Sequence, residues 1–167
     1  MGSSLEQRIA LLEDRARIEE LRADYCFLVD DRRFEELVET RFAPDAVCDF
    51  RARSGAIAPL ISRGREEIRA FFEQVVDVLL KEMCHTVHNQ RTVIEGDRAS
   101  GDCSFELTAV DGTSGEAIVG AGRYLDRYRR VDGRWVFEER RAELFHVAPL
   151  AEGWARRPFV AALTAGR

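Results

Sequence analysis

Histidine is scarce in this chain, where it occurs three times in 167 residues. The four cysteines show no Cys-x-x-Cys spacing, and no histidine, cysteine or acidic cluster has the spacing of a metal site. No Gly-rich loop of the phosphate- or dinucleotide-binding kind is present. The sequence therefore predicts neither a bound metal nor a cofactor.

The chain also lacks a long apolar run. Nothing approaches 18 consecutive apolar residues, so no transmembrane helix is predicted. Residues 1–19 are charged and contain no apolar segment of a signal peptide. Free cysteines inside apolar runs suit a reducing compartment, and we expect a cytoplasmic protein that does not bind membranes.

An excess of positive charge is missing as well. The net charge is −5, and the arginines are interleaved with acidic residues. This excludes the basic surface typical of nucleic-acid-binding proteins. The composition, 46% hydrophobic and 33% charged, is that of an ordinary globular domain.

The first half of the chain shows helical signals. Ser4-Leu-Glu-Gln7 is a capping box, and apolar residues at helical spacing continue to about Val29. Asp31 is placed to cap a short second helix. A turn at 42–45 then precedes a predicted strand at 46–53.

Residues 54–63 have no periodicity and are predicted to form a loop. A third helix with a broad apolar stripe begins at Gly64. Two tight hairpin signals, Glu95-Gly-Asp-Arg98 and Val131-Asp-Gly-Arg134, lie within the chain that follows. They join strand-like runs at about 83–95, 98–110, 116–131 and 134–146.

These elements predict an α+β fold. A long antiparallel sheet should curl into a cone around three helices from the N-terminal half and enclose an apolar pocket. We expect one domain over residues 1–167, with a core at about 10–150 and a tail at 151–167. The tail carries Trp154 and Phe159, and should pack across the domain or onto a neighbour.

Two of the three histidines lie in one predicted strand, Met83–Asn89. Alternate side chains of a strand share a face, so His85 and Asn89 should point one way and His88 the other. His85 is therefore the candidate for a histidine inside the pocket.

Four stretches in this order resemble the SnoaL-like branch of the nuclear transport factor 2-like superfamily, over about residues 10–150. They are Val29-Asp-Asp-Arg-Arg-Phe34, Phe42-Ala-Pro-Asp-Ala-Val-Cys-Asp-Phe50, His85-Thr-Val-His-Asn89 and the segment from Gly122 to Trp135. This resemblance implies the same α+β cone.

Within that branch the chain is most similar to the scytalone dehydratase and hexachlorocyclohexane dehydrochlorinase type, which are cofactor-free lyases. The resemblance implies that Asp30 and His85 form an acid–base pair and that Arg140 matches a dehydrochlorinase arginine. Phe50 stands where the dehydratase has a pocket tyrosine. A second dehydratase histidine has no counterpart among residues 99–110.

Each candidate residue also has a structural interpretation. On an ideal helix Asp30 does not share the apolar face that carries Tyr25, and Asp31 is only slightly better placed. Tyr25 is either a pocket donor or a core aromatic, and Asn89 is either a substrate donor or a strand residue bonded locally. The remaining two candidates are Arg140, for which a bulge would decide which face it occupies, and His146, which could reach the pocket mouth or cap the sheet.

The favoured function is a cofactor-independent lyase or isomerase that acts on a small apolar, aromatic or polycyclic molecule. His85 would be the base and Asp30 its partner, with Tyr25, Asn89 or Arg140 orienting the substrate. Two alternatives stay open: a non-catalytic binding domain, and a structural subunit resembling the β subunits of aromatic-ring dioxygenases. We also expect a homo-oligomer, either a dimer or a trimer.

Overall fold

The computed structural model describes residues 4–155 and 158–160. Helix α1 (Leu5–Asp30) is one continuous element of 26 residues. The predicted capping box is present, since the Gln7 amide donates to Ser4 Oγ and the Ser4 amide to Gln7 Oε1. This reciprocal pair satisfies two donors that the first helical turn would otherwise leave free.

Helix α2 (Phe34–Arg41) starts later than predicted. Its N-cap residue is Arg33, without a side-chain cap, whereas Asp31 is the C-cap of α1. The prediction that Asp31 caps α2 is therefore wrong. The left-handed backbone of Arg32 (φ 61°) makes the sharp reversal between the two helices.

Strands β1 (Phe42–Ala52) and β2 (Leu60–Arg63) extend into segments predicted to be irregular. The predicted turn at 42–45 is the start of β1, where a register shift interrupts its pairing with the neighbouring strand. The last four residues of the predicted loop form β2, which pairs only with β1 at the edge of the sheet. So short an edge strand leaves almost no periodic signal in the sequence.

The third helix consists of α3 (Gly64–Phe71), a π-helical turn η1 (Phe72–Val76) and α4 (Asp77–Leu79). The meander follows as β3 (Leu80–Glu95), β4 (Arg98–Asp111), β5 (Ala117–Val131) and β6 (Arg134–Pro149). Both tight hairpins are present. The turn between β5 and β6 has positive φ at Asp132 (49°) and Gly133 (76°), which is the geometry that an Asp-Gly pair favours.

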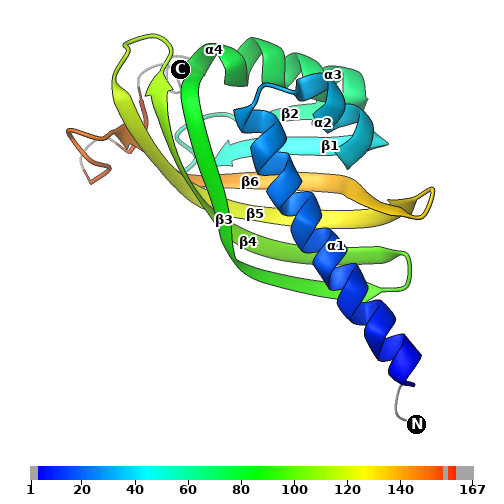
Figure 1. Ribbon diagram of the computed structural model, residues 1–167. Helices are drawn as coiled ribbons and strands as arrows, with labels where there is room; N and C mark the ends of the chain where they lie inside the picture. Colours follow the sequence, from blue (N-terminus) through cyan, green and yellow to red (C-terminus); the bar gives the residue numbers. More distant parts are fainter. Residues whose placement is uncertain (1–3, 156–157, 161–167) are drawn as a thin grey trace.

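The sheet order is β2-β1-β6-β5-β4-β3, and all neighbours are antiparallel except β1 and β6. Helix α1 runs diagonally across one face of the curved sheet, and α2, α3 and α4 lie together at one end (Figure 1). The predicted α+β cone is confirmed. Its core lies between α1 and the inward side chains of the meander.

Two bulges in β6 set the direction of its side chains. Tyr128 pairs with Phe137 but Arg127 with Glu139, so Glu138 is the extra residue. Similarly, Phe145 is extra between Leu144 and His146. Each bulge exchanges the inward and outward positions beyond it.

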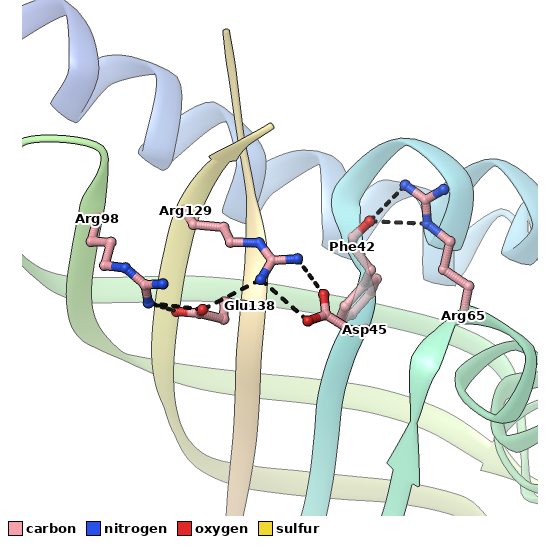
Figure 2. A network of polar contacts seen from close by, with 6 residues as sticks. All are labelled: Phe42, Asp45, Arg65, Arg98, Arg129 and Glu138. Carbon is pink, nitrogen blue, oxygen red and sulfur yellow. Dashed lines mark hydrogen bonds and ion pairs between the residues drawn. The ribbon is translucent and has the colours of Figure 1, made fainter. Parts of the chain in front are cut away.

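A row of charged side chains crosses the sheet at the first bulge (Figure 2). Arg98 donates to both Glu138 carboxylate oxygens at 2.9 Å, and Arg129 lies between Glu138 and Asp45, with Nη1 3.5 Å from Glu138 Oε1 and 3.3 Å from Asp45 Oδ2. Arg65 also donates to the first carbonyl of β1 at 2.8 and 3.1 Å. The row links β4, β5, β6 and β1, where the sheet changes from antiparallel to parallel pairing.

The described part of the tail packs on its own chain. The Val147 amide donates to the Pro158 carbonyl and the Val160 amide to the Val147 carbonyl, both at 2.7 Å. Phe159 and Val160 are buried. Trp154 is 56% exposed and stacks on the His146 ring with centroids 4.6 Å apart.

Candidate active site

A cavity of about 80 Å³ lies between α1, the third helix and the meander. Its walls are apolar except at His85, Tyr25 and Tyr124. Phe50, which replaces a tyrosine of the dehydratase type, is one of the apolar wall residues and packs on Phe71 with ring centroids 4.7 Å apart. Three polar side chains are therefore the groups that can contact a molecule in this cavity directly.

The end of α1 brings Asp30 to the strand that carries His85. Asp30 is the last helical residue, and its Oδ1 lies 2.6 Å from His85 Nδ1. Its other oxygen, Oδ2, accepts the His85 backbone N–H at 3.0 Å. Asp31 is exposed, so the structure places Asp30 rather than Asp31 against the histidine.

The backbone contact fixes the Asp30 carboxylate, and the contact to Nδ1 orients the histidine ring. A carboxylate beside Nδ1 favours the tautomer that carries its proton there, which leaves Nε2 as the proton acceptor. Among the described residues, none hydrogen-bonds to Nε2. The His85 side chain is 3% exposed and lines the cavity, so this nitrogen is available only to what enters there.

Tyr25 and Tyr124 are the other polar groups of the wall. Their rings make edge contacts with each other at 5.7 Å, and Tyr25 meets His85 at 5.8 Å. Burial raises the pKa of both hydroxyls, so both stay protonated and can donate hydrogen bonds. Tyr124 was not among the predicted site residues, although its place in the alternating pattern of β5 marks it as inward.

Arg140 is fully buried but lies behind the cavity wall. Its guanidinium carbon is 3.9 Å from the ring centroids of Tyr25 and Tyr124, and it donates to Asp126 at 2.9 and 3.0 Å. The first β6 bulge turns Arg140 inward together with Phe137. The two tyrosine rings thus stand between this cation and the cavity.

The ion pair continues into a second buried arginine. Tyr128 donates to Asp126 at 2.7 Å and accepts from Arg22 Nε at 2.8 Å. Arg22 also donates to the Gln90 side chain, and a Cβ at Gly101 would collide with its guanidinium. Sequence reasoning missed Arg22, because an arginine in a charged helix usually faces solvent.

Two predicted site residues lie away from the cavity. Asn89 is exposed with φ 52°, because β3 changes register between His88 and Arg91 and the alternation from His85 is lost. The second β6 bulge turns His146 to the outer face, where it stacks on Trp154. His88 is exposed, opposite to His85 as predicted.

Within residues 4–155 and 158–160, no group of three or more histidine, cysteine or acidic side chains could hold a metal ion. Across the same part of the chain, no helix is both long and apolar enough to cross a membrane.

A curved sheet closed by helices over an apolar cavity defines the cone class of the nuclear transport factor 2-like superfamily. Residues 10–141 match the SnoaL-like domain family, and the chain belongs to that family. Uncharacterised proteins of Mycobacterium tuberculosis and Mycobacterium bovis are 33% identical over 92 residues, which is 55% of this chain. The match spans 58% of the length of those relatives.

Solved structures with the same fold include several enzymes. LinA, whose type 2 form is described as a hexachlorocyclohexane dehydrochlorinase, is 25% identical with a TM-score of 0.77, covering 86% of this chain and 94% of LinA. A candidate scytalone dehydratase of Novosphingobium aromaticivorans is 20% identical with a TM-score of 0.71, covering 86% and 91% of the two chains. A candidate aromatic-ring-hydroxylating dioxygenase β subunit of that organism is 20% identical with a TM-score of 0.68, covering 81% and 91%.

Proposed function

We propose that this protein is a cofactor-independent lyase or isomerase that moves a proton on a small apolar molecule. The observation that carries the proposal is the 2.6 Å contact between Asp30 and His85 at the wall of an apolar cavity. A carboxylate that orients an imidazole and stabilises its protonated form is a minimal general acid–base device.

In an elimination, His85 Nε2 takes a proton from a carbon next to the leaving group. The electron pair of the C–H bond forms the new double bond, and the leaving group departs with the electrons of its own bond. Asp30 stabilises the imidazolium formed in this step. In an isomerisation, the imidazolium returns the proton to a different carbon. The apolar wall strengthens the ion pair because it excludes water.

The other polar groups of the wall suggest how the substrate is held. The Tyr25 and Tyr124 hydroxyls, which also interact with each other, would be the donors to an oxygen or a leaving group, since Arg140 is behind their rings. At about 80 Å³ the cavity is well below the roughly 300–1,000 Å³ of sites for drug-sized ligands. These features favour a small, weakly polar substrate over a polycyclic one.

The structural neighbours support a lyase but include another class. LinA and the candidate dehydratase have names that denote elimination, whereas the dioxygenase β subunit belongs to a larger assembly. A structural subunit would not require an Asp–His pair at the wall of an apolar cavity. The cavity therefore favours catalysis over an assembly role.

The experiment is a turnover screen with small halide, enol and epoxide substrates. We expect His85→Ala and Asp30→Asn to lower kcat by about 10²–10⁴-fold, the usual contribution of general acid–base catalysis. His88→Ala is the matched control, because it removes a histidine from the opposite, exposed face of the same strand. Turnover in His85→Ala equal to that of the natural protein would exclude His85 as the base.

A further inference from the structure

Helix α1 carries a second apolar surface that its own fold does not use. Leu5, Ile9 and Leu12 are 69%, 47% and 63% exposed. At about 100° per residue, these three and Ala16 fall within about 60° of one another on the helix. We name Leu5, Ile9, Leu12 and Ala16 the outer stripe.

The outer stripe faces away from the core. The first core-facing residues of α1 are Asp14 and Ile18, which are buried and lie on the opposite side of the helix. Every residue from position 5 to position 13 is exposed, and this end of α1 extends beyond the sheet (Figure 1). The outer stripe is therefore a separate apolar surface and does not continue the face of α1 that packs on the core.

The spacing of the stripe is that of a short coiled coil. Its residues follow at intervals of four, three and four, which places Leu5 and Leu12 at d positions and Ile9 and Ala16 at a positions of a heptad. Apolar residues at a and d form the seam between two paired helices.

The charges beside the stripe repeat with the same period. One flank, at the e positions, carries only acidic residues, namely Glu6, Glu13 and Glu20. The other flank, at the g positions, carries Arg8 and Arg15. Of these five residues only Glu13 forms an ion pair within the described chain, an exposed one with Arg17 at 3.5 Å, which costs little to give up.

We propose that the outer stripe pairs in parallel with the outer stripe of a second copy of this chain. In a parallel pair, a g residue faces the e residue of the next heptad on the other helix. Arg8 then meets Glu13 of the second copy, and Arg15 meets Glu20 of the second copy. An antiparallel pair would set arginine against arginine and glutamate against glutamate, so the charges select both the occupant and its direction.

The fold makes so short a seam workable. An isolated helix of this length is only marginally stable, because nucleating a helix costs free energy. Here the packing of residues 14–30 already holds α1 in helical form. Because the stripe is opposite to the core face, the two sheets lie on the outer sides of the helix pair. A seam of two heptads is small, so the dimer should be weak and dependent on concentration.

The first test is the mass of the full chain in solution, measured by sedimentation equilibrium over a concentration series. We expect a monomer–dimer equilibrium that Leu12→Glu shifts at least about tenfold towards monomer, because it places like charges in the seam. Leu11→Ser is the matched control, since Leu11 is an exposed leucine of the same segment outside the stripe. Circular dichroism and thermal melting should show that both variants fold like the natural chain.

The second test measures direction by disulfide cross-linking. In a parallel pair the two Leu5 positions adjoin, so Leu5→Cys in a Cys84→Ser background should cross-link to itself on mild oxidation. In an antiparallel pair Leu5 would face Ala16, and the two Leu5 positions would be about 16 Å apart. The proposal would be overturned if the chain stayed monomeric at every concentration, or if Leu12→Glu left the oligomer unaffected. It would also be overturned if cross-links formed only between Leu5→Cys and Ala16→Cys.

Discussion

At the scale of single residues, the surroundings of a charged side chain decide whether it can take part in catalysis or only stabilise the fold. Asp30 is partly buried and Arg140 fully buried, but only Asp30 contacts a side chain of the cavity wall that can exchange a proton, namely His85. Arg140 is held by Asp126 and enclosed by the rings of Tyr25, Tyr124 and Phe137. Family resemblance predicts that Arg140 orients a substrate, but Arg140 does not line the cavity, and its surroundings fit a role in stabilising the fold.

This role predicts a large stability effect. Arg140→Met should lower the free energy of unfolding by about 3–5 kcal/mol, because it leaves the buried Asp126 carboxylate with only the Tyr128 hydroxyl and the more distant Arg22. The measurement is urea denaturation followed by fluorescence. Adding Asp126→Asn should recover part of the loss, since the buried charge is then removed. A single variant as stable as the natural chain would show that the ion pair contributes nothing.

At the scale of elements, the bulges in β6 decide which side chains the site receives. Without the first bulge Arg140 would face outward, and without the second His146 would face the cavity. The second bulge lies opposite Gly122 of β5, where a Cβ would meet the Glu143 carbonyl oxygen and the Phe105 ring at 2.5 Å. The missing side chain at Gly122 therefore lets β6 and Phe105 approach β5 closely.

The two glycines of β5 give a matched comparison. Gly122→Ala should destabilise the fold by about 1–3 kcal/mol, because backbone and an aromatic ring must move. Gly120→Ala should cost less, since its nearest contact is the flexible Leu107 side chain at 3.0 Å. Thermal melting of the two variants checks this order. The reverse order would mean that the bulge accommodates the methyl group without strain.

At the scale of the whole molecule, the tail completes the sheet beside β6. Phe159 bridges to Val147 in parallel, beyond the point where β1 leaves β6 at Leu144. Val147 also lines the cavity, so the tail supports the cavity wall from behind. Helix α1 thus lines the cavity directly, whereas residues 158–160 contact it only through Val147.

The tail contact predicts a difference between its two aromatic residues. Phe159→Ala should lower the free energy of unfolding by about 3–5 kcal/mol, as is usual for a buried phenylalanine. Trp154→Ala should change it by less than about 1 kcal/mol, because that side chain is mostly exposed. Chemical denaturation of both variants measures the difference. Equal, small effects would show that the described tail does not stabilise the domain.

Local patterns of the sequence determined most of the elements. The capping box fixed the start of α1, and the Asp-Gly turn fixed the β5–β6 hairpin, because both depend on residues only two or three positions apart. Alternation along β3 correctly separated His85 from His88. The partnership of His85 with Asp30 came from family resemblance, since helical periodicity did not place Asp30 inward.

Tertiary structure decided the features that depend on distant partners. A bulge arises where two strands fit each other, so the inward position of Arg140 and the outward position of His146 could not be obtained from β6 alone. Asp30 turns towards His85 because α1 ends there and the chain reverses at Arg32. Period and turn chemistry are local properties of a chain, whereas the face a side chain finally occupies depends on what packs against it.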